Sequence, residues 1–124
     1  MNGSSLIIDT NIALYLLSGN EWLANTLNGS QIYLSFITEL ELLGYKGISP
    51  AEQKNVKRFI SVCTIIDINE SIKKFAVEIR KAQSIKLPDS IIAATALYLE
   101  VPLFTADKDY KRISDLSLLL YSPK

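Results

Sequence analysis

The chain has no histidine among its 124 residues and only one cysteine, Cys63. The absence of histidine excludes a serine–histidine hydrolase, a histidine general base and a zinc site with histidine ligands. One cysteine can form neither an internal disulfide nor a cysteine cluster for zinc, and its apolar surroundings predict that Cys63 is a small core residue. Any catalysis must therefore depend on carboxylates, hydroxyls, lysines or a bound metal.

The sequence also lacks an uncharged apolar stretch of about 18 residues, the length that a transmembrane helix needs. Its first ten residues, MNGSSLIIDT, have neither the basic region nor the long apolar stretch of a signal peptide. We therefore expect a cytoplasmic protein that makes no use of a membrane. The length predicts one domain, residues 1–124, and a hydrophobic content of 48% is enough to build a core.

Segments typical of strands alternate with segments typical of helices along most of the chain. This alternation favours parallel βαβ units and predicts a three-layer α/β/α sandwich with a central, mainly parallel sheet. The expected strands are 5–8, 31–35, 64–68, 101–105 and 116–121. The expected helices are 12–19, 21–27, 36–47, 50–62, 70–84, a buried helix from about Pro88 to Leu99, and 108–113.

Several aspartates occupy related places in this pattern. Asp9 follows the first strand, Asp107 and Asp109 follow the strand at 101–105, and Asp89 lies in the first turn of the buried helix. Asp9 and Asp89 also have an ordinary explanation, since aspartate caps helices and favours their first turn. Because parallel strands end at one edge of the sheet and the buried helix starts there, we expect these acids to lie together. Carboxylates without histidine or cysteine favour Mg²⁺ or Mn²⁺.

A glutamate, Glu41, is expected on the predicted helix 36–47, where it is equally well explained as an ordinary surface residue beside Glu39. Acidic and basic residues number 13 each, so the net charge alone does not indicate a nucleic-acid-binding protein. If the five acids named above form one site, eight acidic residues remain to face 13 basic ones. That distribution fits an acidic pocket in a basic surround that handles a phosphate backbone, and it also fits an evenly mixed surface.

Four segments, IIDTN, ITELELLG, LPDSIIAATAL and LFTADKDY, together resemble the PIN domain family, and in particular its VapC-type toxins of bacterial and archaeal toxin–antitoxin pairs. The resemblance spans nearly the whole chain, with the acidic residues in the family's order and approximate spacing. The sequence departs from the family at Ser90, where alanine is frequent, and at Tyr110, where phenylalanine is frequent.

The resemblance implies a metal-dependent endoribonuclease that hydrolyses RNA phosphodiester bonds with Mg²⁺ or Mn²⁺. It implies that Asn11 and Thr105 support the site through hydrogen bonds. The implied catalytic residues are Asp9, Glu41, Asp89 and Asp107, and the implied metal ligands are Asp9, Asp89, Asp107 and Asp109. Basic residues that could contact the RNA backbone are Lys46, Lys73, Lys74, Arg80 and Lys86.

The resemblance further implies three partners: the RNA substrate, a cognate antitoxin that covers the acidic groove, and a second copy in a homodimer. Trp22, Leu23 and Leu27 could serve a protein contact or belong to the core. An alternative function is an inactive PIN-like module that binds RNA or a protein. A receiver-type signalling domain that binds Mg²⁺ is a weaker alternative, because it needs an acidic pair after the first strand, where only Asp9 stands.

Overall fold

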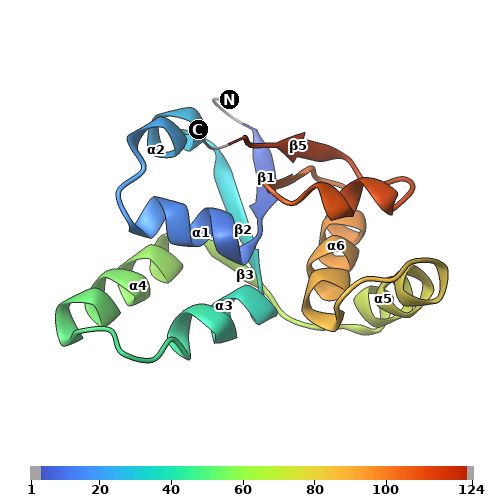
Figure 1. Cartoon of the computed structure of the whole chain (residues 1–124), viewed down its shortest axis with the longest axis horizontal. Helices are drawn as coiled ribbons and strands as arrows, with labels where there is room; N and C mark the ends of the chain where they lie inside the picture. Colours follow the sequence, from blue (N-terminus) through green and yellow to red (C-terminus); the bar gives the residue numbers. More distant parts are fainter. Residues whose placement is uncertain (1–3, 123–124) are drawn as a thin grey trace.

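Five short strands form one sheet in the computed structural model of the chain, which describes residues 4–122 (Figure 1). The strand order is β3-β2-β1-β4-β5, and every neighbouring pair is parallel. The predicted α/β fold is thus confirmed, with a sheet that is wholly parallel within the described residues. The strands are β1 (Ser5–Ile8), β2 (Gln31–Ser35), β3 (Thr64–Ile66), β4 (Leu103–Thr105) and β5 (Leu118–Leu120).

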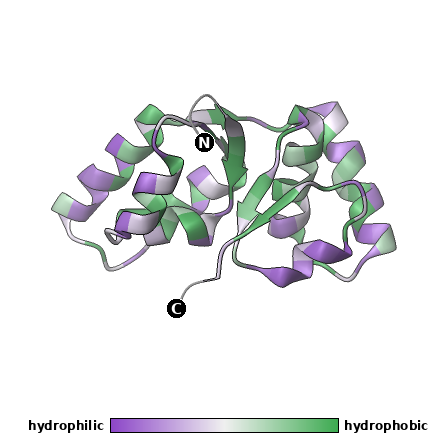
Figure 2. Cartoon of the chain, turned by 90° about the horizontal axis from the view of Figure 1, so that it is seen from above, coloured by the Kyte–Doolittle hydropathy of each residue, from purple (hydrophilic) through white to green (hydrophobic). Residues whose placement is uncertain are grey.

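Helices cover both faces of the sheet (Figure 1). They are α1 (Thr10–Leu17), α2 (Glu21–Leu27), α3 (Phe36–Leu43), α4 (Pro50–Val62), α5 (Glu70–Ala82) and α6 (Leu87–Leu99), and a 3₁₀ helix, η1 (Lys108–Arg112), follows β4. Side chains alternate across a strand, so Ile7 packs with α5 and α6 while Leu6 and Ile8 pack with α1 and α2 on the opposite face. Figure 2 shows the hydrophobic residues concentrated on the strands and on the inner sides of the helices.

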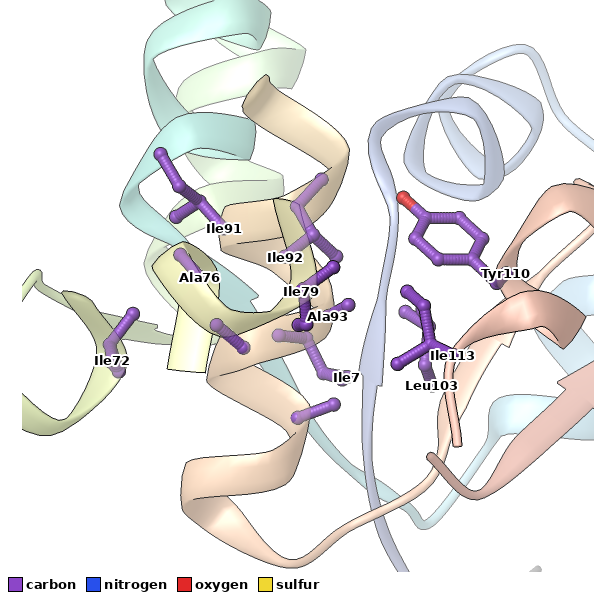
Figure 3. Packing of buried hydrophobic residues seen from close by; sticks show 12 residues of the cluster. Ile7, Ile72, Ala76, Ile79, Ile91, Ile92, Ala93, Leu103, Tyr110 and Ile113 are labelled. Atoms are coloured by element: carbon purple, nitrogen blue, oxygen red, sulfur yellow. The ribbon is translucent and has the colours of Figure 1, made fainter. Parts of the chain in front are cut away.

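The two helices on the Ile7 face are buried to different extents. From Ser90 to Ala96 every residue of α6 is buried, and its three alanines let the helix lie close to its neighbours. By contrast, α5 is amphipathic and buries only Ile72, Ala76 and Ile79. Phe75 of the same helix lies outside this buried stripe and is 36% exposed. Figure 3 shows this packing, with Tyr110 and Ile113 beside the helices.

Most differences from the expected boundaries have local causes. The helix after β1 begins at Thr10 because Asp9 caps it, and the helix after β2 ends at Leu43, with Gly44 as its C-cap. The strand before Asp107 starts only at Leu103, after Pro102, which has no N–H to donate to a sheet. The predicted strand 64–68 ends at Ile66, the one at 116–121 covers only Leu118–Leu120, and the helix from Glu70 ends at Ala82.

Three predictions about apolar residues are resolved by their burial. Leu23 and Leu27 are core residues, whereas Trp22 of the same helix is 58% exposed and stacks on Tyr121. The thiol of Cys63 is only partly buried, and burial raises its pKa to about 11.

Within residues 4–122, no helix is both long enough and apolar enough to cross a membrane.

The strand order creates a switch point at the centre of the sheet. From β1 the chain moves to β2 and β3 on one side, and then returns to β4 on the other side of β1. In open parallel sheets, ligands bind beyond the carboxyl ends of the strands where the direction of winding reverses. The residues that follow β1 and β4 therefore occupy the position in the fold that favours a site.

Candidate active site

Asp9 lies directly after β1, at the switch point, and its carboxylate is fixed from two sides. It caps α1 by accepting a hydrogen bond from the backbone N–H of Ile12 at 3.0 Å, and it also accepts one from the hydroxyl of Thr105. Thr105 is fully buried at the end of β4, and its oxygen accepts a hydrogen bond from the backbone N–H of Asp107 at 3.0 Å. Thr105 thus links the residues that follow β1 and β4 through its hydroxyl group.

The acids predicted from the sequence line two adjoining cavities. The first, of about 360 Å³, has Asp9, Glu41, Asp89 and Asp107 in its wall, together with Asn11. The second, of about 410 Å³, is lined by Asp89, Asp107 and Asp109. The structure thus brings the four predicted catalytic acids to one cavity. Asp89 and Asp107 belong to both walls, so they separate this cavity from the one that Asp109 lines.

The two acids deepest in the site are both destabilised in their charged form. Burial is the main cause that raises the pKa of Asp9, opposed by the hydrogen bonds from Thr105 and Ile12 and reinforced by the charges of Asp89 and Asp107. Burial also raises the pKa of Asp89, and the charge of Asp107 adds to the effect. The cavity therefore gathers carboxylates whose charges repel one another and are partly removed from water, which favours a compensating cation.

Tyr110, on η1, lies beneath Asp89 and is 1% exposed. Its ring packs in the apolar cluster with Leu103 and Ile113, while its hydroxyl points away from those two side chains (Figure 3). A hydrogen bond between this hydroxyl and Asp89 lowers the pKa of the carboxyl group, in opposition to burial. Burial together with the charges of Asp89 and Asp9 raises the pKa of the phenol, so Tyr110 stays protonated and can only donate to a carboxylate.

The donor set at the cavity fits a hard divalent cation in chemistry, though not as a closed cage. Within residues 4–122, no three acidic or cysteine side chains converge on a ready-made metal position. Mg²⁺ keeps several water ligands and is commonly held by one or two carboxylates together with substrate phosphate oxygens. The oxygens of Asp9, Asp89 and Asp107 around one cavity meet that requirement.

The predicted basic residues divide into one at the site and four away from its walls. Lys86, the N-cap residue of α6, lines both acidic cavities. The four that line neither cavity are exposed, with Lys46 after α3 and Lys73, Lys74 and Arg80 on α5, where Lys73 pairs with Glu70 at 3.6 Å.

Two residues at the cavities were missed by the sequence analysis. Arg112 lines the second cavity and pairs with Asp109 at 3.6 Å. Thr10 donates a hydrogen bond to Glu41 at 2.5 Å. The only sequence signal for Thr10 is that it directly follows Asp9, and for Arg112 that it lies one helical turn after Asp109.

The wholly parallel sheet, with four acids around one cavity beyond the ends of its central strands, defines an α/β domain that has an acidic cavity at its switch point. The model of the PIN domain family matches residues 6–116, and the chain belongs to this family. The family resemblance noted in the sequence is thereby confirmed. No curated protein matches the chain.

Solved structures that match over nearly the full length include toxin–antitoxin proteins. One chain of a toxin–antitoxin complex from Klebsiella pneumoniae is 30% identical, with a TM-score of 0.78 over 92% of this chain and 95% of that chain. One chain of VapBC-1 from nontypeable Haemophilus influenzae is 25% identical, with a TM-score of 0.75 over 94% and 97%. One chain of VapBC2 from Rickettsia felis, bound to a DNA fragment from their promoter, is 24% identical, with a TM-score of 0.83 over 95% and 99%.

Proposed function

We propose that the protein is a metal-dependent endoribonuclease and the toxin of a toxin–antitoxin pair. The observation that carries the proposal is the cavity at the switch point, whose wall contains Asp9, Glu41, Asp89 and Asp107. Membership of the PIN domain family and the likeness to toxin–antitoxin complexes support it. The reaction is hydrolysis of an RNA phosphodiester bond.

Asp9, Asp89 and Asp107 would hold one or two Mg²⁺ or Mn²⁺ ions, and Asp109 would contribute from the second cavity. When bound, such an ion polarises a phosphoryl oxygen and lowers the pKa of a water molecule. Glu41 on α3 lines the same cavity as these ligands and is the group proposed to accept the proton of the attacking water.

The surrounding residues orient the acids and the substrate. Thr105 fixes one oxygen of Asp9 and the backbone of Asp107, so that both carboxylates keep their places relative to the strand ends. Lys86 provides positive charge at the rim of both cavities, where a phosphate next to the scissile bond would lie. Lys46, Lys73, Lys74 and Arg80 would contact more distant parts of the RNA backbone. Asn11 lines the same cavity beside Asp9 and would donate to a ligand there.

Two protein partners are part of the proposal: a cognate antitoxin and a second copy of the chain. The similar chain from Klebsiella pneumoniae belongs to a toxin–antitoxin complex, which supports an antitoxin partner here. A cytoplasmic location follows from the proposed RNA substrate.

A second function, binding of RNA or protein without cleavage, is favoured by one specific observation. The described acids do not form a three-ligand metal site by themselves. A family member that had lost the ability to bind a metal could keep the same acids around the cavity. A measurement of RNA cleavage must therefore decide between the two functions.

Cleavage of a mixed RNA pool tests the proposal directly. Purified protein, free of antitoxin, is assayed with Mg²⁺, with Mn²⁺ and with EDTA, beside Asp89→Asn. The proposal predicts cleavage that requires the metal and is lost in the variant. Absence of cleavage by folded protein with either metal, or equal cleavage by Asp89→Asn, would establish the non-cleaving alternative or a different site.

A further inference from the structure

A chain of three oxygen-bearing side chains links α1 to α3 at the rim of the first cavity. The hydroxyl of Thr10 lies 2.5 Å from the Oε1 atom of Glu41 and 3.1 Å from the hydroxyl of Thr38. Thr38 is fully buried, whereas Glu41, one helical turn further along α3, is exposed. The chain therefore runs from the protein interior to a carboxylate at the surface.

The direction of the hydrogen bonds follows from the groups involved. A carboxylate can only accept, so the single proton of the Thr10 hydroxyl is donated to Glu41. The oxygen of Thr10 is then free to accept the proton of Thr38. Hydrogen bonds in such a series polarise one another, and a hydrogen bond to a charged acceptor is stronger than one between neutral groups.

Thr10 contacts Glu41 through its side chain and follows Asp9 directly in the chain. It is the first residue of α1, directly after Asp9, whose carboxylate caps the same helix. Its backbone is thus fixed by the Asp9 cap, while its side chain holds Glu41 from a different element, 31 residues further along the chain. Without this bond, an exposed glutamate would sample many rotamers, and ordering such a side chain costs free energy.

We propose that Thr10 is a positioning residue that holds the carboxylate of Glu41 in the wall of the first cavity, with Thr38 as its buried support. The inference rests on the proposed nuclease function, and it adds that the threonine after Asp9 acts on the reaction only through Glu41. Glu41 is then preorganised before the substrate arrives, which spares the enzyme the ordering step during the reaction.

A mutant cycle with Thr10→Val and Glu41→Gln tests this role. Valine keeps the shape of threonine and removes the hydroxyl. We expect each single variant to lower kcat for RNA cleavage by about 10- to 100-fold, with little change in KM, as misplacement of a reacting group does. The double variant should be no slower than Glu41→Gln alone. Losses that multiply would overturn the inference, because Thr10 would then act independently of Glu41.

Two further variants serve as controls. Thr10→Ser keeps the hydroxyl and should retain kcat within about threefold of the wild type, whereas a residue that matters only for packing would not distinguish serine from valine in this way. Thr64→Val, at an exposed threonine on the edge strand β3, should leave kcat unchanged. Wild-type kcat in Thr10→Val, with cleavage by the wild type established, would disprove the positioning role.

A readout without metal or RNA separates this inference from the proposed function. In protein labelled with ¹³C at the glutamate carboxyl groups, the Glu41 signal is identified by its absence in Glu41→Gln. This signal should move in Thr10→Val and stay in place in Thr64→Val. If the wild type cleaves no RNA, the nuclease proposal fails by itself; an unmoved Glu41 signal shows that Thr10 does not hold Glu41.

Discussion

The acids that line the two cavities differ in how deeply the fold buries their carboxyl groups. We call Asp9 and Asp89 the inner acids, because burial raises the pKa of both, and Glu41 and Asp109 the outer acids, because both are exposed. Asp9 follows the buried strand β1 and Asp89 lies in the first turn of the buried helix α6, whereas the outer acids stand on exposed turns of α3 and η1. The fold thus bears an electrostatic cost at the inner acids that it avoids at the outer ones.

Such a cost persists in a protein when the costly group serves a function. The charges of the inner acids repel each other, and neither acid has a basic partner at salt-bridge distance within the described residues. A cation would compensate both effects at once. We therefore propose that the inner acids are the main metal ligands, with Asp107 between the two groups, and we expect substitutions at the two kinds of acid to have different consequences.

Asp9→Asn should have the largest effect on activity. We expect RNA cleavage to fall by about 10³-fold or more, because the inner carboxylate is lost where charge develops in the reaction. The matched control is Asp67→Asn, which changes an exposed aspartate just after β3, at the same edge of the sheet but two strands away. Single-turnover cleavage rates measure both, and equal losses would show that the switch point has no special role.

Thr105→Val should have the next largest effect. It leaves an oxygen of Asp9 without its donor and the N–H of Asp107 without its acceptor. Loss of buried hydrogen bonds predicts destabilisation of about 1–3 kcal/mol, and cleavage should fall by about 10²-fold as Asp9 loses its orientation. Thr95→Val removes a buried hydroxyl that bonds only the Ile91 carbonyl of its own helix, and it should leave the cleavage rate unchanged. Urea denaturation and cleavage assays compare the two variants.

The inner acids also predict a pH dependence of stability in protein without metal. A carboxyl group with a raised pKa in the folded state binds protons more tightly there than in the unfolded chain. Its stabilising contribution is complete below the ordinary pKa of 3.8 and is lost as pH rises through the folded-state value. The unfolding free energy of the wild type minus that of Asp89→Asn should therefore decrease as pH rises above 3.8 in EDTA. A difference that increases with pH would contradict the burial of Asp89.

Asp109→Asn should have the smallest effect. Asp109 is exposed, lines only the second cavity, and pairs with Arg112 across an exposed surface. Exposed ion pairs contribute about 0–1 kcal/mol, so stability should hardly change, and we expect cleavage to fall by about tenfold or less. A loss as large as that of Asp9→Asn would remove the distinction between inner and outer acids.

The sequence predicted the elements with strong local signals. The helices Glu21–Leu27 and Pro50–Val62 begin where the sequence analysis expected them, and the structure shows that Asn20 and Ser49 cap them. The meeting of Asp9, Asp89 and Asp107 also followed from local features, because parallel strands and the helices between them place these positions at one edge of the sheet. The assignment of one domain to residues 1–124 stays a prediction.

What sequence reasoning missed depends on side chains that meet from separate elements. Thr10 and Glu41 are 31 residues apart, and neither periodicity nor capping indicates their contact. The basic residues of α5 were predicted as RNA contacts because they are numerous on one helix, but they do not line the acidic cavities. Lys86, which was predicted, and Arg112, which was not, line them. Solubility alone accounts for exposed charges on an amphipathic helix.

The most direct test of the central claim, that the inner acids form a divalent cation site, is the thermal unfolding midpoint of the wild type and Asp89→Asn with and without Mg²⁺. In EDTA the variant should be at least as stable as the wild type, because burial and repulsion of one inner charge are relieved. Mg²⁺ should raise the midpoint of the wild type, since a ligand that binds only the folded state stabilises it, and should leave Asp89→Asn nearly unchanged. Equal Mg²⁺ responses of the two proteins would contradict the claim.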